Sequence, residues 1–293
     1  MPADSNNYEL LDFGAGRKLE RFGAIVLDRP CPAAAAAEMS RPDLWRNVTA
    51  QYQASRVNDG DWKPAAKKWV ASDWYFEHAG AAKIRLQLDA LPSGQVGVFP
   101  EQCENWEWVT RHVAKAQAVA ERPLRVMNLF AYTGGSTLAA AAAGAEVVHV
   151  DAARNIVERA RQNAAMSGLE DRPIRWIVED AMKFARRELK RGNRYDAIIL
   201  DPPSYGHGPG GEAWKIGDDL LPLLEVCGQL TAHSRAFVLV TCHTPGIAPA
   251  DLSAYLSEGI FGNCGQPPAT GELFLKTADG LRLPSGVFAR WPR

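Results

Sequence analysis

The sequence predicts an α/β protein in which a mostly parallel sheet of seven strands follows a small N-terminal α+β or mostly-β domain. From residue 123 onward, strand-like apolar runs alternate with helical stretches, which is typical of a parallel sheet with helical crossovers. Two strand-like runs near the C-terminal end, on either side of a turn containing Gly280, indicate an antiparallel hairpin. Residues 1–100 differ, because their alternating segments are shorter and are interrupted by proline and glycine.

Each expected strand of the sheet is a short apolar run bounded by turn-forming residues, which is typical of buried strands. The strands are expected, in chain order, at 124–130, 146–151, 174–179, 195–201, 236–242, 271–277 and 286–291. Two intervening helices are expected at 136–144 and 153–168, and each ends at a glycine, as helices commonly do. We therefore expect a β-rich domain at 1–100, a connecting helix at 101–122 and a larger domain at 123–293.

Tryptophan is concentrated in the first part of the chain. Six of the nine tryptophans precede residue 109, namely Trp45, Trp62, Trp69, Trp74, Trp106 and Trp108. Large aromatic side chains usually form a core. One or two of them on the surface would instead offer a stacking platform for a nucleic-acid base.

Composition excludes several classes of protein. The formal net charge of −1 argues against a general polyanion binder, so the basic stretch 183–194 predicts either a solvated helix face or a local nucleic-acid contact. No apolar run approaches the roughly 18 to 20 residues that span a bilayer, and the N-terminus lacks the features of a signal peptide. The five cysteines include no CxxC pair, which predicts no metal site and is typical of the cytoplasm.

The turn after the first strand of the sheet, AYTGGST, predicts a ligand site. A glycine-rich turn from strand to helix lets the backbone approach a ligand and directs helix N–H groups toward an anion. A dinucleotide site and an S-adenosylmethionine site both use such a turn. Only Gly134 and Gly135 are present here, so the GxGxxG fingerprint of the dinucleotide site is absent.

Two acids stand at the ends of the next two strands. Asp151 ends the second strand, where a carboxylate can accept hydrogen bonds from two ribose hydroxyls of either cofactor. Asp180 follows the third strand, where it can accept a hydrogen bond from an adenine amino group. Both positions are also common sites of helix N-caps, so each acid keeps a structural alternative.

The fourth strand ends in Asp201, Pro202, Pro203 and Ser204. The two prolines remove backbone donors and leave carbonyl groups that, together with the acid, can accept hydrogen bonds from a planar substrate. A rigid loop at the edge of the sheet is the structural alternative. Because this loop follows, in chain order, two acids that could bind a cofactor, it predicts the part of a group-transfer site that holds the acceptor molecule.

These motifs, in this order, resemble the class I S-adenosylmethionine-dependent methyltransferases, whose catalytic domain is Rossmann-like. The resemblance runs from residue 95 to the C-terminus and is carried by NLFAYTGGSTLAAAAAGA, RWIVEDAMKF and RYDAIILDPPSYGHGP. Similarity is strongest to the ribosomal RNA large-subunit methyltransferase group, which includes the cytosine-C5 enzymes. Members of this group often carry an N-terminal PUA domain that binds RNA. Residues 1–100 resemble instead the small domain that precedes the catalytic core.

The resemblance implies that S-adenosylmethionine is the cofactor. Asp151 would hold the ribose, Asp180 the adenine amino group, and Asp201 would face the transferring methyl. The residues expected along the cofactor are Phe130, Tyr132, Thr133, Gly134, Gly135, Asp151, Ala152, Asp180, Ala181 and Asp201.

The methylated atom depends on a cysteine. A nitrogen acceptor needs only the Asp-Pro-Pro loop, whereas cytosine C5 is a poor nucleophile and needs a thiolate to add at C6. Cys242 ends the fifth strand, which in a doubly wound sheet lies beside the fourth, and the cytosine-C5 members of the group carry a cysteine at this place. His243 can lower its pKa or accept its proton. A buried structural thiol is the alternative, as we expect for Cys31, Cys103, Cys227 and Cys264.

The leading hypothesis is a cytoplasmic methyltransferase that acts on RNA, with cytosine C5 in ribosomal RNA favoured. The alternative is N-methylation of a base or of a protein amine or amide. An NAD(P)-dependent oxidoreductase is disfavoured by the missing GxGxxG, and the intact acids argue against a non-catalytic RNA-binding relative. RNA is the expected partner, and a homodimer stays open. The expected catalytic residues are Asp201, Pro202, Pro203 and Cys242, and the expected substrate contacts are Ser204, Tyr205, Trp214 and Lys215.

Overall fold

The computed structural model describes residues 7–56, 59–262 and 267–292, and the chain divides into two compact units. Unit 1 comprises Met1–Cys103 and Phe274–Ser285, and unit 2 comprises Glu104–Leu273 and Gly286–Arg293. Nearly all of the helix expected as a connector therefore groups with unit 2, whereas the tip of the C-terminal hairpin groups with unit 1. The expected domain limits at 100 and 122 stay predictions.

Unit 2 is built on a seven-stranded sheet whose strand order is β10-β9-β8-β11-β14-β16-β15. The strands are β8 (Arg125–Leu129), β9 (Glu146–Asp151), β10 (Ile174–Val178), β11 (Ala197–Leu200), β14 (Phe237–Cys242), β15 (Ala269–Lys276) and β16 (Arg282–Trp291). Within this order the first five strands, β10, β9, β8, β11 and β14, pair in parallel, and β16 pairs antiparallel with β14. This order confirms the predicted seven strands and the terminal hairpin.

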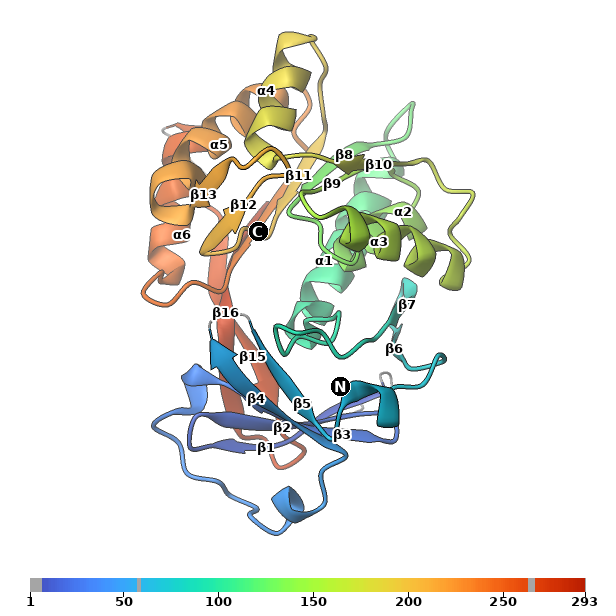
Figure 1. Cartoon of the computed structure of the whole chain (residues 1–293). Coiled ribbons are helices and arrows are strands. Elements are labelled where there is room, and N and C mark those ends of the chain that lie inside the picture. The colour runs from blue at the N-terminus through green and yellow to red at the C-terminus, as the bar shows by residue number, and fades with distance from the viewer. Residues whose placement is uncertain (1–6, 57–58, 263–266, 293) are drawn as a thin grey trace. The chain divides into compact units, whose positions relative to one another are not determined.

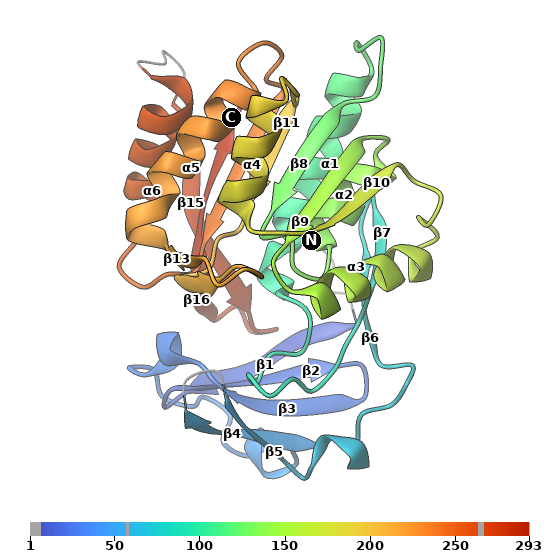
Figure 2. The same ribbon diagram turned by 45° about the horizontal axis from the view of Figure 1, so that its top comes forward.

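Helices cover both faces of this sheet (Figures 1 and 2). The helices are α1 (Cys103–Gln117), α2 (Gly135–Ala142), α3 (Arg154–Met166), α4 (Ala181–Lys190), α5 (Ile216–Leu230) and α6 (Pro249–Leu256), the last continued by a π turn at Ser257–Phe261. Figure 2 shows α4, α5 and α6 on one face and α1, α2 and α3 on the other. Because both faces are covered, β11 and β14 are buried along their whole length, and only Thr241 of β14 is polar.

The core of unit 2 lies between the sheet and its helices. One large cluster joins the sheet to α4, α5 and α6, and includes Met127, Ile198, Val240, Phe184, Leu220 and Leu252. On the opposite face, Trp108 of α1 meets Phe237 of β14 edge to face, with ring centroids 5.6 Å apart. These contacts hold the sheet whose strands β8, β9, β11 and β14 lead at their carboxyl ends to the predicted ligand residues.

Unit 1 is β-rich, and its main sheet has the order β1-β2-β3-β4-β5. Its strands are β1 (Tyr8–Gly14), β2 (Arg17–Phe22), β3 (Ile25–Pro30), β4 (Ala50–Arg56) and β5 (Asp59–Lys63), with a separate hairpin of β6 (Tyr75–Ala79) and β7 (Lys83–Gln87). Short 3₁₀ turns lie at Pro32–Ala34, Leu44–Arg46, Ala66–Lys68 and Pro100–Gln102. Leu275 and Leu283, from the end of the chain, pack with Leu10 and Ala34.

The tryptophans of unit 1 line up in an aromatic row. Trp62, Trp69 and Trp74 contact one another edge to face with centroids 5.4 and 5.5 Å apart, and Tyr52 and Phe22 extend the row at its two ends. Trp62 and Trp74 are buried, as are Trp106 and Trp108 of unit 2. The core interpretation therefore holds for these four side chains. The indole N–H of Trp45 donates to Asp12, 2.7 Å away.

Candidate active site at the carboxyl edge of the sheet

The turn between β8 and α2 has an unusual backbone. Phe130 and Tyr132 have φ angles of 56° and 48°, and Gly134 has a φ of 97°. Side-chain-bearing residues with left-handed backbones cost of order 1 kcal/mol each and persist where the surrounding structure holds them. Here the Ala131 N–H donates to the Val150 carbonyl at 3.0 Å, and the Tyr132 N–H donates to the Asp151 carboxylate at 2.9 Å.

Asp151 lies directly beneath this turn at the end of β9. One carboxylate oxygen accepts from Tyr132 N and the other accepts from Ala153 N at 3.0 Å. Burial raises the pKa of the Asp151 carboxyl, and the backbone N–H groups around it oppose that shift. An ionised carboxylate has about four acceptor positions, so Asp151 can hold the turn and still accept hydroxyl donors. Ala152 is half-buried, and its backbone is among the groups that oppose the rise in the pKa of Asp151.

The two glycines of the turn have different causes: packing within unit 2 excludes a side chain at Gly135, and a left-handed backbone favours glycine at Gly134. A Cβ atom at Gly135 would lie 2.3 Å from Cζ2 of Trp106, and one at Gly134 would lie 3.3 Å from Cβ of Ala160. Thr133 is buried, and its carbonyl accepts from the Asn163 side chain at 2.9 Å. The contact between Trp106 and Gly135 is long-range, and nothing in the local sequence of either residue indicates it.

Asp180 caps helix α4, because its Oδ1 atom accepts the N–H of Lys183 at 2.8 Å. Asp180 is therefore a helix N-cap, the structural alternative considered for it, and this cap uses only one of its two carboxylate oxygens. Ala181 is buried in the core cluster, so only its backbone is available to a ligand.

Asp201 follows β11 and contacts the end of β14 and the residue after it. Its Oδ1 atom accepts the Thr241 hydroxyl at 2.6 Å and lies 3.4 Å from Nε2 of His243. Ser204 Oγ and Thr244 Oγ1 lie 2.7 Å apart. Three side-chain contacts thus join the loop 201–204 to residues 241–244, next to the pairing of β11 with β14.

Cys242 is the last residue of β14, within the segment that contacts the Asp-Pro-Pro-Ser loop. Its side chain is 1% exposed, and its sulfur accepts the Thr244 N–H at 3.4 Å. Burial raises the pKa of the Cys242 thiol, and the nearby charge of Asp201 adds to the increase. The structure therefore brings Cys242 to the same sheet edge as Asp201 and leaves its thiol protonated at rest.

The remaining expected residues lie on a small hairpin of β12 (Tyr205–His207) and β13 (Ala213–Lys215). Pro202 is buried and Pro203 is exposed, and the Pro203 carbonyl accepts the indole N–H of Trp214 at 2.7 Å. Trp214 is itself buried against Phe130, whereas Tyr205 and Lys215 are exposed. One of the two proline carbonyls is thus already engaged within the protein.

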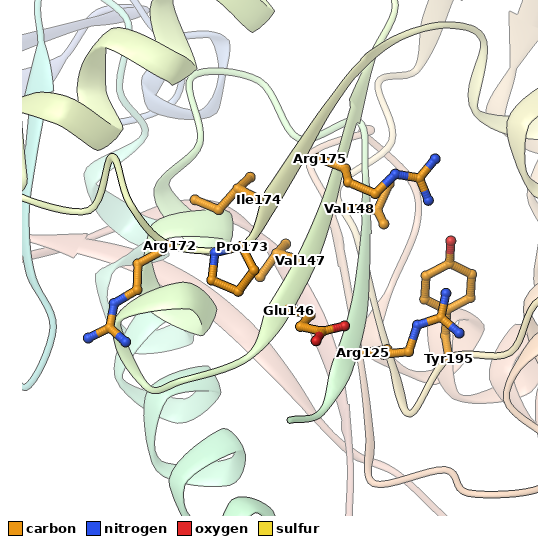
Figure 3. A pocket seen from close by; sticks show the side chains of 9 residues that line it. All are labelled: Arg125, Glu146, Val147, Val148, Arg172, Pro173, Ile174, Arg175 and Tyr195. Carbon is orange, nitrogen blue, oxygen red and sulfur yellow. The ribbon is translucent and has the colours of Figure 1, made fainter. Parts of the chain in front are cut away.

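The opposite edge of the sheet holds a different pocket, of about 280 Å³ (Figure 3). It lies where β8, β9 and β10 begin, and its lining includes three arginines together with Glu146 and Tyr195. The Arg125 guanidinium lies 5.1 Å from the centre of the Tyr195 ring (Figure 3). None of the residues expected in the site lines this pocket, so the candidate site lies at the carboxyl edge.

Two further properties concern metal ions and membranes. Among the residues that the structure describes, no group of three or more His, Cys, Asp or Glu side chains could hold a metal ion. In the same part of the chain, no helix combines the length and the apolar character needed to cross a bilayer.

Comparison with known proteins identifies the class of this site. A family described as S-adenosylmethionine-dependent methyltransferase matches residues 62–252. A methyltransferase from Agrobacterium tumefaciens, of known structure, is 36% identical, with a TM-score of 0.87 over 97% of this chain and 90% of its own. One from Streptococcus mutans, 16% identical with a TM-score of 0.73 over 98% of this chain and 75% of its own, shares the fold.

Curated relatives extend the comparison to named enzymes. Ribosomal RNA large subunit methyltransferase I of Aeromonas salmonicida is 32% identical over 219 residues, which cover 71% of this chain and 50% of the relative. The protein of that name from Aeromonas hydrophila gives the same identity and coverage. The chain thus spans about half the length of the curated relatives that it matches.

Proposed function

Because the chain belongs to the S-adenosylmethionine-dependent methyltransferase family, we propose that it methylates RNA, with cytosine C5 in ribosomal RNA as the favoured acceptor. The names of the curated relatives support the RNA substrate. S-adenosylmethionine supplies an already activated methyl group. The protein therefore has to bind this cofactor and to position an acceptor atom in line with the methyl.

The turn after β8 and the acids of the carboxyl edge would hold the cofactor. Phe130, Tyr132, Gly134 and Gly135 would flank its methionine part, with Thr133 inside the turn. Asp151 and Ala152 would contact the ribose, and Asp180 and Ala181 the adenine. Two features support this assignment: the strained backbone of the turn, and the remaining acceptor capacity of Asp151.

The position of Cys242 beside Asp201 carries the proposal of C5 chemistry. In that reaction the Cys242 thiolate would add to C6 of the cytosine, and C5 would then accept the methyl, with S-adenosylhomocysteine as the leaving group. Loss of the C5 proton and release of the thiolate complete the reaction. Because burial raises the thiol pKa, the sulfur must first lose a proton, and His243, whose ring lies 3.4 Å from Asp201, would accept it.

A second acceptor, nitrogen, is favoured by the same burial. A side chain that is 1% exposed, with a raised pKa, is also what a structural core cysteine would show. Asp201 and the carbonyl of Pro202 could then accept hydrogen bonds from an amine and leave its lone pair directed at the methyl. This mechanism needs no thiolate.

One pair of variants decides between the two acceptors. Cys242→Ala should abolish transfer of labelled methyl from S-adenosylmethionine to ribosomal RNA taken from cells that lack the gene. RNA containing 5-fluorocytosine should trap a covalent adduct with the wild-type protein but not with Cys242→Ala, because fluorine cannot leave C5 as a proton does. Cys227→Ala, at a second buried thiol on α5, is the matched control and should keep both properties.

Full activity of Cys242→Ala without an adduct would exclude the C5 mechanism and leave nitrogen as the acceptor. Mass spectrometry of ribosomal RNA nucleosides from cells with and without the gene would then identify the methylated atom. An unchanged set of nucleosides, with methyl transfer only to protein, would exclude RNA as the substrate.

A further inference from the structure

The hairpin of β12 and β13 (Figure 1) follows the Asp-Pro-Pro-Ser loop directly, and its two faces carry different side chains. Its paired residues are Tyr205 with Lys215, Gly206 with Trp214, and His207 with Ala213. Successive side chains of a strand point to opposite faces. One face of the hairpin therefore carries Gly206 and Trp214, and the other carries the four remaining residues.

The face with Trp214 fixes the hairpin to unit 2. Trp214 is 5% exposed, its indole N–H donates to the Pro203 carbonyl, and its ring centroid lies 4.7 Å from that of Phe130. At the base of the hairpin, the Ile216 N–H donates to the Ser204 carbonyl at 3.1 Å. The hairpin is thus held in place beside Asp201.

The tip of the hairpin reaches the other end of the proposed cofactor site. Glu212 accepts the Gly210 N–H at 2.9 Å and lies 3.5 Å from the ammonium group of Lys183 on α4. A Cβ atom at Gly208 would lie 3.0 Å from Cβ of Asp180. The hairpin therefore extends from the Asp-Pro-Pro loop to the N-terminus of α4.

The outer face of the hairpin presents an aromatic ring and a cation to solvent. Tyr205 is 75% exposed, and its cross-strand partner Lys215 and its neighbour His207 are exposed as well. The Asp219 carboxylate, in the first turn of α5, accepts the backbone N–H of Lys215 at 2.7 Å. An aromatic ring beside a cation is the combination that binds single-stranded nucleic acid, through base stacking and phosphate contact.

We infer that the outer face of this hairpin, formed by Tyr205, His207 and Lys215, binds an unpaired segment of the RNA substrate next to the target nucleotide. Tyr205 stacks on a base of that segment, and Lys215 contacts a phosphate. This inference rests on the proposed RNA substrate. It further requires single-stranded RNA, because the base on Tyr205 must be free of its own helical stack.

Binding of a short fluorescein-labelled single-stranded RNA, followed by anisotropy, tests the inference. Tyr205→Ala should weaken binding by roughly 5- to 150-fold, the range found for loss of one stacking ring, and Tyr205→Phe should restore it. Lys215→Ala should reduce the slope of log Kd against log salt by about 0.7, as expected for one phosphate contact with a single strand. Two exposed residues, Lys115 on α1 and Val119 just after it, offer the controls Lys115→Ala and Val119→Ala, which should leave both quantities unchanged.

Three results would overturn the inference, and they differ in what they say of the proposed function. If the wild-type protein methylates RNA and Tyr205→Ala binds and methylates it equally well, the hairpin is not the contact and the function stands. If the wild-type protein neither binds nor methylates RNA but methylates a protein fraction, both fail together. Equal binding of a duplex of the same sequence would also contradict the stacking role of Tyr205.

Discussion

An indole ring occupies the space in which a side chain at Gly135 would begin. Cζ2 of Trp106 would lie 2.3 Å from a Cβ atom there, well inside van der Waals contact. We predict that Gly135→Ala destabilises unit 2 by about 1–3 kcal/mol, the usual cost of an overpacked site. Urea unfolding followed by circular dichroism would measure the loss.

Two further variants show whether the ring is the cause. In a Trp106→Leu background, Gly135→Ala should cost less than in the wild type, because the smaller side chain leaves room. Gly217→Ala, in the first turn of α5 and with no heavy atom within 4 Å of the added Cβ, should be neutral or slightly stabilising. Equal effects at 135 and 217 would show that the Trp106 contact does not require the glycine.

At the scale of elements, α4 begins at an acid that has two candidate roles. Asp180 caps the helix, and it also lies where the adenine of the cofactor is proposed to bind. We predict that Asp180→Ala lowers the free energy of unfolding by about 1 kcal/mol, because the Lys183 N–H loses its acceptor. Asp180→Ser should retain the cap and the stability, since serine is also a good N-cap residue.

Calorimetric titration with S-adenosylmethionine separates the two roles. If Asp180 also binds the adenine amino group, Asp180→Ser should bind the cofactor several-fold more weakly. Its midpoint denaturant concentration for unfolding should equal that of the wild type. Wild-type affinity in Asp180→Ser would reduce Asp180 to a helix cap and remove it from the proposed site.

Elements with a clear hydrophobic pattern could be predicted from the sequence, and the others could not. The strands β11 and β14 are unbroken buried runs, so their positions and the adjacency of Asp201 and Cys242 followed from the pattern. The hairpin at 205–215 consists of two three-residue strands with glycines between them. Strands this short show no hydrophobic periodicity from which they could be predicted. The contact of Trp106 with Gly135 depends on tertiary packing that local sequence does not encode.

At the scale of the whole molecule, a buried polar chain links β8, α2 and β9. The Asn128 amide donates to the Thr137 hydroxyl at 2.9 Å, and this hydroxyl lies 2.9 Å from Nδ1 of His149. All three side chains are buried. Burial disfavours the imidazolium form and lowers the pKa of His149 from its ordinary value to about 3. The folded state therefore keeps this histidine neutral throughout the physiological range of pH.

The depressed pKa of His149 makes stability depend on acidity in a defined direction. In the unfolded chain an ordinary histidine binds a proton below pH ~6.5, whereas folded His149 does not until the pH approaches about 3. The unfolded state binds more protons in this window, so stability falls as the pH is lowered through it. Through His149 alone, lowering the pH from 7 to 5 should reduce the free energy of unfolding by about 2 kcal/mol.

Substitution by valine isolates this contribution from that of other titrating groups. At pH 7, His149→Val should be less stable than the wild type by about 1–3 kcal/mol, because the Thr137 hydroxyl loses a partner in the core. At pH 5 the difference should shrink by about 2 kcal/mol, since only the wild type carries the proton-binding penalty. Urea unfolding of both proteins at the two pH values measures this change. A difference that stays constant would mean that His149 is not held neutral by the fold, and the buried chain would then have to open to admit a proton.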